Sequence, residues 1–387
     1  MSVDVLLVPD LPIERWPSMD RYASRLLDGL TREATDLTIR SAGPISRLTD
    51  LERLPPPTRG SGARFMGDAG LSDTEWRRYV RRYWRYPRRI RRLRGDVSHV
   101  LDHSYAHIVP PAGRSRPTVV TVHDLFPVLT VDRAPTSWRE RLRNTLLQRV
   151  LDGLRRADAW IVATAWLRTQ LAEWLGHTDG IHLIRFGVDE TFFSPPARDR
   201  SATRLDWDIP DDAFVLLHVG SVGRRKNFSA VVATLDGLRT RGVEAFLVQL
   251  GGDPDPKHHR DIEDRSLTPF VRFLGARAEG DLHAAYHAAD TLLFPSHYEG
   301  FGFPVLEAMA SGLPVVTSGA GGLTEVAGDA AVIVGGREVE PYAAAVERIV
   351  EDAEWRQALQ TRGRTHARHF RWRDTARDTA RVYRALA

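Results

Sequence analysis

The stretch SHYEGFGFPVLEAMASGLPVV, residues 296–316, predicts a loop, a helix and a strand that follow one another in a parallel sheet. The apolar run before it, DTLLFPS, is typical of a buried strand that ends in a turn. Pro304 fits the first position of the helix, where its missing N–H is not needed. Because Gly300 and Gly302 let a ligand approach the backbone, and a helix start presents unpaired N–H groups, this loop favours a phosphate.

Two glutamates of this stretch, Glu299 and Glu307, require a separate explanation. Carboxylates beside a phosphate repel it unless they accept hydrogen bonds from hydroxyl groups instead. A nucleotide sugar carries such hydroxyls on its ribose and on its sugar. We therefore interpret the loop as a nucleotide-sugar site, and the competing interpretation is a pair of ordinary carboxylates at a helix end.

Apolar runs of strand length alternate with helical stretches, which predicts an α/β fold with doubly wound parallel sheets. In the C-terminal half the strand candidates are FVLLHVG, AFLVQLGG, VRFLG, TLLFPS, PVVTS and AVIVGG. In the N-terminal half they are VDVLLVP, DLTIRS, DVSHVLDH, TVVTVHD, AWIVAT and IHLIRFG. Together they predict two Rossmann-like domains that face each other across a cleft, with ligands at the carboxyl ends of the strands.

The domain boundary is expected near the polar, proline-containing stretch SPPARDRSATRLDWDIPDD, which has the composition of a linker. Residues 1–195 would form the acceptor-side domain, and residues 196–370 would form the domain that binds the donor. The C-terminal helix, residues 371–387, is expected to pack back on the first domain. The stretch PPPTRGSGARFMGDAG, residues 55–70, is predicted to be a loop.

The composition excludes several classes of protein. The chain of 387 residues is 42% hydrophobic, long enough for two or more domains, and has a net charge of +4. Zero cysteines exclude disulfides, thiolate metal sites and cysteine nucleophiles. No run of about eighteen apolar residues occurs, and the N-terminus does not resemble a signal peptide. We expect a soluble, cytoplasmic protein.

The strongest local shift in composition is WRRYVRRYWRYPRRIRRLRG, residues 76–95, where arginines alternate with aromatic residues. An apolar stripe at helical spacing predicts an amphipathic helix, which Pro87 should kink. Three interpretations compete: a core-facing helix with a solvated arginine face, peripheral attachment of Trp76–Gly95 to an anionic membrane surface, and nucleic-acid binding. No recognisable nucleic-acid module accompanies the segment, so we expect no nucleic-acid partner.

A second glycine-containing turn, HVGSVGRRKNF, residues 218–228, follows a predicted strand and contains Arg225 and Lys226. Arginine can clamp phosphate oxygens, and lysine supplies a point charge that stabilises a departing diphosphate. A solvated basic turn is the simpler alternative. The turns contain neither the dinucleotide GxGxxG pattern nor a Walker P-loop, so redox cofactors and ATP hydrolysis lose support.

The sequence GSVGRRKN, followed by EGFGFPVLEAMASGLPVV and GGLTEVAGDAAVIV, resembles the donor domain of the retaining family 4 glycosyltransferases, which have the GT-B fold. The resemblance implies that Glu307 holds the ribose hydroxyls, Glu299 faces the transferred sugar, and the basic pair neutralises the diphosphate. It also implies a catalytic set of His123, Glu299, Lys226 and Arg225. The implied donor-binding residues are Gly220, Ser221, Phe273, Leu274, Phe301, Gly302, Phe303 and Glu307.

In the N-terminal half, TVVTVHDLFP places His123 and Asp124 at a strand end, similar to the histidine that faces the donor sugar in many members of this family. A structural histidine is the alternative. Asp102 and His103, in DHSYAH, are further candidates for sugar hydroxyls, against a satisfied polar loop. The chain departs from the family at the first strand, where VPDLPIERWPS replaces a double glycine, although Ser18 could cap the following helix.

The resemblance implies a nucleoside diphosphate sugar as co-substrate. The sequence does not name the base or the sugar, and we take GDP-mannose as the leading donor ahead of UDP- or dTDP-linked sugars. The acceptor would be a saccharide, a lipid-linked saccharide or a small molecule. We expect no metal and no cofactor, because the DPD at residues 253–255 and the adjacent His258 and His259 fit a chance match and a solvated loop. A non-catalytic sugar-nucleotide-binding protein and a phosphorylase-like enzyme with pyridoxal phosphate on Lys226 or Lys257 are the alternatives.

Overall fold

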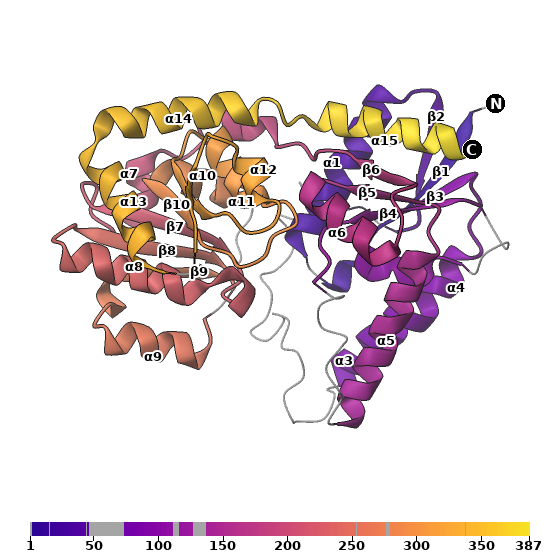
Figure 1. Ribbon diagram of the computed structural model, residues 1–387, viewed down its shortest axis with the longest axis horizontal. Coiled ribbons are helices and arrows are strands. Elements are labelled where there is room, and N and C mark those ends of the chain that lie inside the picture. The colour runs from indigo at the N-terminus through magenta and orange to yellow at the C-terminus, as the bar shows by residue number, and fades with distance from the viewer. Residues whose placement is uncertain are drawn as a thin grey trace. The chain divides into compact units, whose positions relative to one another are not determined.

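The computed structural model describes residues 2–14, 16–43, 45, 73–110, 116–126, 137–252, 254–275, 279–336 and 338–387. The chain forms two compact units, drawn in Figure 1. The first contains the described residues up to Gly187 together with Trp372–Ala387, and the second runs from Val188 to Arg371. The predicted loop at 55–70 lies outside the described residues.

The first unit is built on a six-stranded sheet with the order β2-β1-β3-β4-β5-β6, and all its neighbouring strands are parallel. The strands are β1 (Val3–Val8), β2 (Leu37–Ser41), β3 (Val97–Val100), β4 (Thr118–Val122), β5 (Ala159–Val162) and β6 (Ile181–Leu183). The helices are α1 (Pro17–Glu33), α3 (Asp73–Val80), α4 (Tyr86–Ile90), α5 (Trp138–Arg155), α6 (Ala165–Leu175) and α15 (Trp372–Leu386). All six strands predicted in this half are confirmed.

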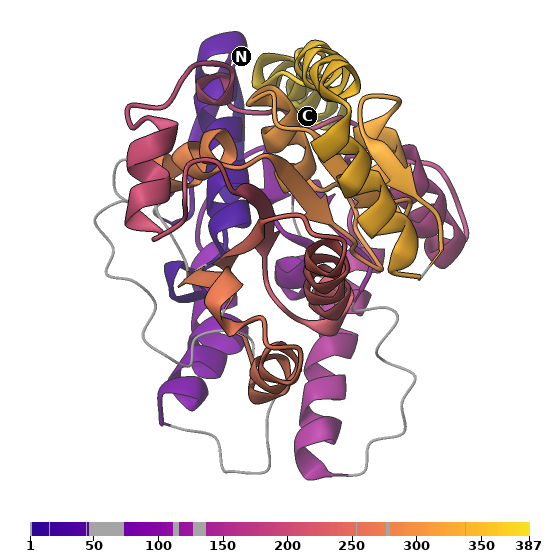
Figure 2. The same cartoon turned by 90° about the vertical axis from the view of Figure 1, so that its left-hand side faces the viewer.

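The second unit has the sheet order β12-β11-β10-β7-β8-β9, again with parallel neighbours. The strands are β7 (Phe214–Gly220), β8 (Ala245–Gly251), β9 (Val271–Gly275), β10 (Thr291–Phe294), β11 (Val315–Ser318) and β12 (Val332–Val334). The helices are α7 (Arg200–Asp206), α8 (Phe228–Thr240), α9 (Pro256–Asp264), α10 (Glu279–Ala288), α11 (Phe303–Ala310), α12 (Leu323–Ala327), α13 (Glu340–Glu351) and α14 (Ala353–Ala367). These six strands also match the prediction, and Figure 2 gives a second view of the helices around the sheet.

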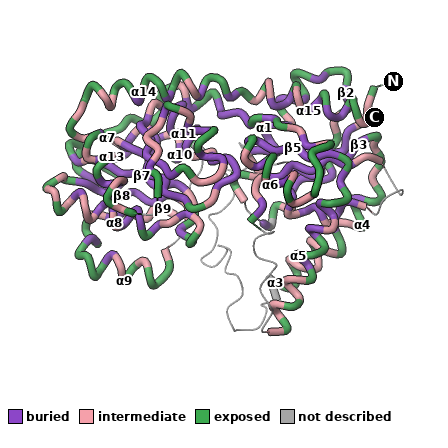
Figure 3. The backbone as a smooth tube through the Cα atoms, viewed as in Figure 1, coloured by how far each residue is buried: buried purple, intermediate pink, exposed green. Residues whose placement is uncertain are grey.

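The central strands could be predicted from the sequence because both of their faces are buried. Every residue of β4 and of β10 is buried. Figure 3 shows the buried, purple parts of the tube in the middle of each unit. Parallel strands covered by helices on both faces read as unbroken apolar runs rather than alternating ones. The two sheets therefore confirm two Rossmann-like doubly wound units.

The last helix of the chain, α15, belongs to the first unit and packs on α1. A Cβ on Gly29 of α1 would lie 2.8 Å from the Cβ of Ala376, so only glycine permits this close approach. The Tyr383 hydroxyl lies 2.5 Å from Nδ1 of the buried His99 in β3. A residue from the C-terminus thus completes the polar interior of the first unit.

The arginine-rich segment is interrupted near Pro87, as predicted, although the form of the interruption was not foreseen. Helix α3 passes into a π-helical stretch, Arg81–Arg85, and the short α4 begins directly before Pro87. Proline has no N–H to donate and its ring clashes with the carbonyl four residues earlier, which the wider π turn relieves. Within the described residues, no helix is long and apolar enough to cross a lipid bilayer.

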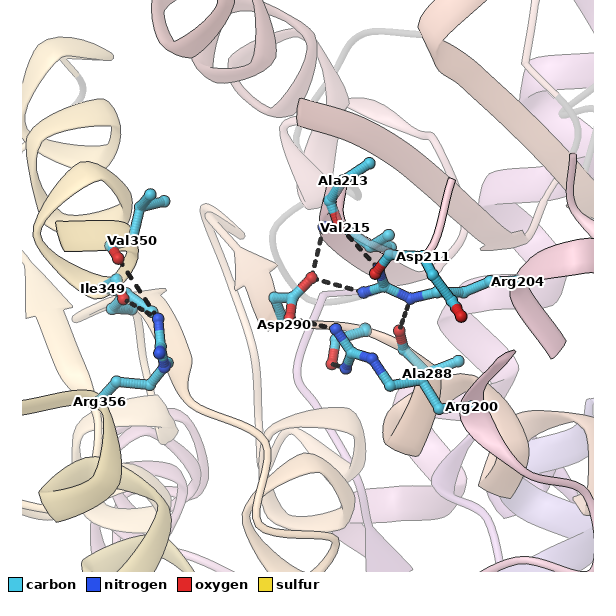
Figure 4. A network of polar contacts seen from close by, with 11 residues as sticks. Arg200, Arg204, Asp211, Ala213, Val215, Ala288, Asp290, Ile349, Val350 and Arg356 are labelled. Carbon is cyan, nitrogen blue, oxygen red and sulfur yellow. Dashed lines mark hydrogen bonds and ion pairs between the residues drawn. The ribbon is translucent and has the colours of Figure 1, made fainter. Parts of the chain in front are cut away.

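The amino edge of the second sheet carries a buried ion pair with a structural role (Figure 4). Arg204 is fully buried, and its guanidinium donates to Oδ2 of Asp290 at 2.6 Å. It also donates to the backbone carbonyl oxygens of Asp211, Ala213 and Ala288. Asp290 accepts further hydrogen bonds from Arg200 and from the Val215 N–H. A buried charge with this many partners fixes helix α7 to the strand ends.

Candidate active site

The basic turn after β7 places Lys226 next to Glu299. The Lys226 Nζ atom donates to Oε1 of Glu299 at 2.6 Å, and both side chains are less than 10% exposed. The ammonium also lies 4.5 Å from the centre of the Phe294 ring, at the end of β10. A guanidinium nitrogen of Arg225 lies 3.9 Å from Glu299. The second unit therefore brings the basic turn next to the first glutamate of the motif, a contact that the sequence analysis did not predict.

The loop of Glu299 is held by the backbone on both sides. Its carbonyl oxygen accepts the N–H of Gly322 at 2.8 Å, and a Cβ on Gly321 would lie 2.3 Å from that same oxygen. Earlier in the loop, the His297 N–H donates to the Arg225 carbonyl at 2.7 Å. The loop is thus fixed to the basic turn and to the GGLTEVAG stretch, whose glycines the close approach requires.

The second glutamate of the motif, Glu307, lies on α11 and is buried. Its Oε2 accepts the hydroxyl hydrogen of Tyr286, on α10, at 2.8 Å. The tyrosine was not singled out from the sequence, because it belongs to no motif. A buried carboxylate oriented by a phenol hydroxyl has a fixed direction, which suits a group that binds a pair of ligand hydroxyls.

The helix after this loop begins one residue earlier than the sequence predicts, so that Pro304 is its second residue rather than its first. Helix α11 begins at Phe303 with Pro304 in its first turn, and Gly302 before it has φ of +101°. At that angle a side chain would be strained, and its Cβ would lie 2.5 Å from Leu323. The Phe301 and Phe303 rings lie 5.0 Å apart, edge to face. Gly302 therefore leaves the backbone between the two phenylalanines free of a side chain directly before the helix start.

Two polar residues beneath the basic turn were missed by sequence reasoning. Nδ1 of His218 in β7 pairs with Oε1 of Gln249 in β8, and Nε2 of Gln249 donates to the Gly220 carbonyl at 2.8 Å. Burial, with the nearby charge of Lys226, lowers the pKa of His218 to about 4. The available signal was a polar residue inside each of two apolar strands that pair in register.

The remaining donor-side candidates lie at the ends of β7 and β9. Gly220 has φ of +131° and its Cα faces the Lys226 side chain, and Ser221 after it is exposed. The pairing between β8 and β9 shifts after Phe273, which pairs with Gln249, so that Gly275 rather than Leu274 pairs next. The shift leaves Leu274 without a register partner in β8.

In the first unit, His123 follows β4 directly and is half-buried. Its Nε2 donates to the Leu101 carbonyl at 2.9 Å, which leaves Nδ1 as the nitrogen with a lone pair. The edge of the ring meets Tyr22 at a centroid distance of 4.8 Å. Burial lowers the pKa of His123, so the imidazole is neutral near pH 7. A neutral histidine can accept a hydrogen bond from a ligand through Nδ1, but it does not supply a positive charge.

Asp102, His103 and Asp124 lie together at the ends of the neighbouring strands β3 and β4. The Asp102 Oδ1 accepts the Ser104 N–H at 2.7 Å and lies 3.2 Å from Nδ1 of His103. Nε2 of His103 lies 3.5 Å from Asp124. Burial lowers the pKa of His103, but the hydrogen bond to Asp124 and the charge of Asp102 outweigh it and raise the pKa above its usual value.

Beside this group lies a second buried cluster that the sequence did not indicate. Glu14 is 4% exposed and accepts hydrogen bonds from Arg82 at 3.2 Å, from the Tyr105 hydroxyl at 3.0 Å, and from Arg78. Arg82 also donates to the Ser104 carbonyl at 2.6 Å. The sequence did not indicate this role of Arg82, because composition does not show which arginine of a basic run is buried.

Two expectations are corrected by the structure. Ser18 does not cap the following helix: α1 begins at Pro17 with Trp16 before it, and no side-chain cap is present. Proline at the first helical position moved the start ahead of the serine. His258 and His259 lie on α9 and not in the expected solvated loop: Asp255 caps this helix by accepting the N–H groups of Lys257 and His258, while Asp253 lies outside the described residues. No cluster of three metal-ligating side chains occurs in the described parts of the chain.

Two family models match the chain. The family described as glycosyl transferases group 1 matches residues 199–366, and the one described as Glycosyltransferase Family 4 matches residues 19–192. The first match falls on the unit with the Lys226–Glu299 pair. The second falls on the unit with His123.

Relatives and solved structures agree with these matches. A D-inositol 3-phosphate glycosyltransferase from Corynebacterium kroppenstedtii is 29% identical over 74% of this chain and 67% of its own length. The O-antigen chain mannosyltransferase B of Escherichia coli is 32% identical over 44% of this chain and 45% of its own length, so the match spans less than half of it. Anabaena Alr3699/HepE, solved with UDP and glucose, has a TM-score of 0.74 at 17% identity, over 99% of this chain and 100% of that one.

Proposed function

Since the chain belongs to the group 1 glycosyltransferases and has their GT-B fold, we propose that it transfers a sugar from a nucleoside diphosphate sugar to an acceptor hydroxyl with retention of the anomeric configuration. The observation that carries this proposal is the buried Lys226–Glu299 pair at 2.6 Å, with Arg225 beside it, at the strand ends. Cations there would neutralise the diphosphate as it departs, which is a large part of the catalysis such a transfer requires.

The proposed chemistry needs no covalent intermediate on the protein. The bond between the sugar's anomeric carbon and the diphosphate oxygen breaks, and the acceptor oxygen bonds to the same face of that carbon. The departing phosphate takes the acceptor's proton. In this scheme Lys226 and Arg225 bind the diphosphate, Glu299 and His123 face the sugar, and Glu307 holds the ribose hydroxyls.

For the donor we propose GDP-mannose, with a UDP- or dTDP-linked sugar as the alternative. The E. coli relative is named a mannosyltransferase, which supports the first, and the Anabaena protein was solved with UDP, which supports the second. The acceptor would be a saccharide, a lipid-linked saccharide or a small molecule. The unpaired Leu274 segment beside Gln249 offers backbone groups that would distinguish the bases.

A thermal-shift screen against GDP, UDP and dTDP tests this proposal first. A nucleotide at about a hundred times its dissociation constant stabilises the folded chain by about 2.7 kcal/mol. The matching nucleotide sugars are then incubated with an acceptor panel, and release of nucleoside diphosphate is followed. NMR of the product gives the anomeric configuration: an inverted product rejects the retaining mechanism, and the absence of stabilisation by every nucleotide rejects the function.

We also propose that the transfer is independent of metal ions. The positive charge that a divalent cation would supply to a diphosphate is available from Arg225 and Lys226. The rate of transfer should therefore be the same after dialysis against EDTA as after dialysis followed by addition of magnesium or manganese. A loss of activity in EDTA that either ion restores would contradict this proposal.

The arginine-rich segment Trp76–Gly95 is proposed to attach to an anionic membrane surface. Trp76 is 49% exposed and Trp84 is 36% exposed, so these rings are not consumed by the core. By contrast Tyr86 and Ile90 are buried, and they anchor the segment to the first unit. Basic residues at an anionic surface contribute about 1 kcal/mol each, and exposed tryptophans settle at the headgroup level.

Cosedimentation with liposomes tests the membrane proposal. The variant changes four exposed arginines to glutamine, and these are Arg81, Arg85, Arg89 and Arg92. It spares Arg78 and Arg82, because both bind Glu14 and their loss would disturb the fold. Wild-type chain should sediment with anionic liposomes at low salt, less at high salt, and the variant should remain in the supernatant. Equal recovery with neutral and anionic liposomes would end this proposal.

A further inference from the structure

A small pocket at the carboxyl edge of the first sheet is lined by three aspartates. Asp10 follows β1, Asp102 follows β3, and Asp20 lies in the first turn of α1. The remaining lining residues are apolar: Pro9, Met19, Ala23, Ile45 and Leu101. Neither lysine, arginine nor histidine lines the pocket within the described residues. The pocket has room for a water-sized group, so it can take a single functional group of a ligand.

Asp10 is the residue that indicates a ligand. Both of its carboxyl oxygens are buried, and neither has a hydrogen-bond donor in the described part of the chain. The carboxyl of Asp102 is close enough to share one proton with Asp10, but one proton cannot serve both of its oxygens. A buried acceptor without a donor costs free energy that a bound donor group would recover.

The three carboxyls of the pocket have no cationic side chain beside them among its described lining residues, so the site favours a positively charged ligand. Burial, together with the charge of Asp102, raises the pKa of Asp10 well above its usual value. Burial also raises the pKa of Asp20 to about 6. Arg82 binds Glu14, and its charge only partly offsets the rise in the pKa of Asp10, while His103 lies between Asp102 and Asp124. A positively charged group in the pocket would stabilise the ionised form of these carboxyls, whereas the carboxylates would repel a phosphate.

We propose that this pocket binds an ammonium group of the acceptor, so that the acceptor is an amine-bearing saccharide or cyclitol rather than a phosphorylated one. An ammonium carries three N–H donors and one positive charge, which match three carboxylates around a small site. The inference rests on the proposed transfer reaction, and it names the chemical class of that reaction's acceptor. Asp10 is the binding residue on which it chiefly depends.

The test compares matched acceptors with the full-length chain and a saturating donor. The panel contains amino sugars and aminocyclitols, the N-acetylated form of each, and phosphorylated forms of the same rings. Acetylation removes the charge and keeps the ring. The amine should be used with a kcat/KM at least about tenfold above that of its acetylated and phosphorylated counterparts.

Two variants then assign the preference to the pocket. Asp10→Asn and Asp20→Asn should each reduce the preference for the amine to within about twofold. The second variant keeps the test valid if the first fails to fold, since it removes a carboxylate whose ionisation burial already opposes. Asp28→Asn, an exposed residue on the same helix as Asp20, is the matched control and should keep the wild-type preference.

The outcomes separate this inference from the proposed function. Stabilisation by a nucleoside diphosphate together with transfer only to phosphorylated or acetylated acceptors overturns the inference and leaves the function intact. Failure to use any amine in the panel also overturns it, as does an equal preference in Asp10→Asn, Asp20→Asn and Asp28→Asn. Absence of stabilisation by every nucleotide overturns the function itself.

Discussion

The carboxyl edges of the two sheets differ in the sign of their charge. In the second unit the edge carries Arg225 and Lys226, with Glu299 as their buried partner. In the first unit the edge carries Asp10 and Asp102, and a cation such as Arg82 is already bound to another acid. Two sheets of similar build thus carry different side chains at their carboxyl edges. Function lies in side chains placed on a fold and not in the fold itself.

The difference matches the two substrates that a transferase must bind. A diphosphate is strongly anionic and needs fixed cations, whereas an acceptor hydroxyl or amine needs hydrogen-bond acceptors. One edge that served both would bind each of them poorly, because charges that attract the first repel a cationic second. Four variants test this division, beginning with the one expected to have the largest effect.

Lys226→Met should remove most of the activity if the basic edge binds the departing diphosphate. Loss of one fixed group that stabilises developing charge typically lowers kcat about 10²- to 10³-fold. Release of nucleoside diphosphate gives the rate. The double variant Lys226→Met with Glu299→Gln avoids an unpaired buried carboxylate, which alone can cost about 3–5 kcal/mol of stability. Lys257→Met is the control, because Lys257 is exposed. Turnover above a tenth of the wild-type value would contradict the assignment.

His218 should make the basic edge sensitive to acid. Its pKa is lowered to about 4 in the folded chain by burial, with the Lys226 charge adding to the effect, so the unfolded chain binds more protons below its ordinary pKa near 6.5. The stability it contributes is complete above that pH and falls as the pH decreases toward 4, by about 3 kcal/mol.

Urea unfolding at pH 7 and at pH 4.5 measures this loss. In the His218→Phe variant the difference in unfolding free energy between the two pH values should be smaller than in wild type. Other buried histidines titrate in the same range, among them His99 and His107, so the comparison with wild type isolates the contribution of His218. An identical pH dependence in both proteins would rule out the neutral, buried histidine.

Glu307→Gln should weaken donor binding about ten- to hundredfold, because a hydrogen bond to a charged group is worth about 1.5–3 kcal/mol. Calorimetry with the nucleoside diphosphate, and with an analogue that lacks the ribose 2′- and 3′-hydroxyls, separates the contacts. The variant should no longer distinguish the two ligands. Glu351→Gln, at an exposed position of α13, is the control. Continued discrimination by Glu307→Gln would place the ribose elsewhere.

His123→Ala tests whether the first unit takes part in the transfer. Turnover should decrease about ten- to hundredfold, while the dissociation constant of the nucleoside diphosphate stays close to the wild-type value. Single-turnover kinetics and calorimetry measure the two effects. His177→Ala, at an exposed position of the same unit, is the matched control. A change confined to donor affinity would mean that His123 has no role in the transfer step.

The sequence predicted the twelve strands and the donor-side motifs for a physical reason. Strands such as β4 and β10 are buried on both faces, and glycines stand where the backbone comes close to a neighbour. Both properties are local, so they leave a local pattern. The Lys226–Glu299 pair joins residues that are distant in the chain, yet each belongs to a motif, and the motifs placed them at neighbouring strand ends.

The acidic edge of the first unit was much less predictable. Asp10 is a single aspartate after a strand, and its significance depends on the absence of a nearby donor among the described residues, which no sequence pattern records. Glu14 and Arg82 meet only because the chain folds back over more than sixty residues. The π-helical stretch after Val80 is likewise the local form that the helix takes before Pro87. Helix propensity predicts only that the proline interrupts the helix, and not the form of the interruption.

The position of α15 has a consequence for how the chain folds during its synthesis. Most domains fold as units while the chain emerges from the ribosome, and the N-terminal one usually finishes first. Here the first unit lacks the helix that covers Gly29 and supplies Tyr383 until residues Trp372–Leu386 have been translated. The second unit, complete at Arg371, is therefore the first that can close its core. A chain truncated before Trp372 should consequently contain a folded second unit and an incomplete first unit.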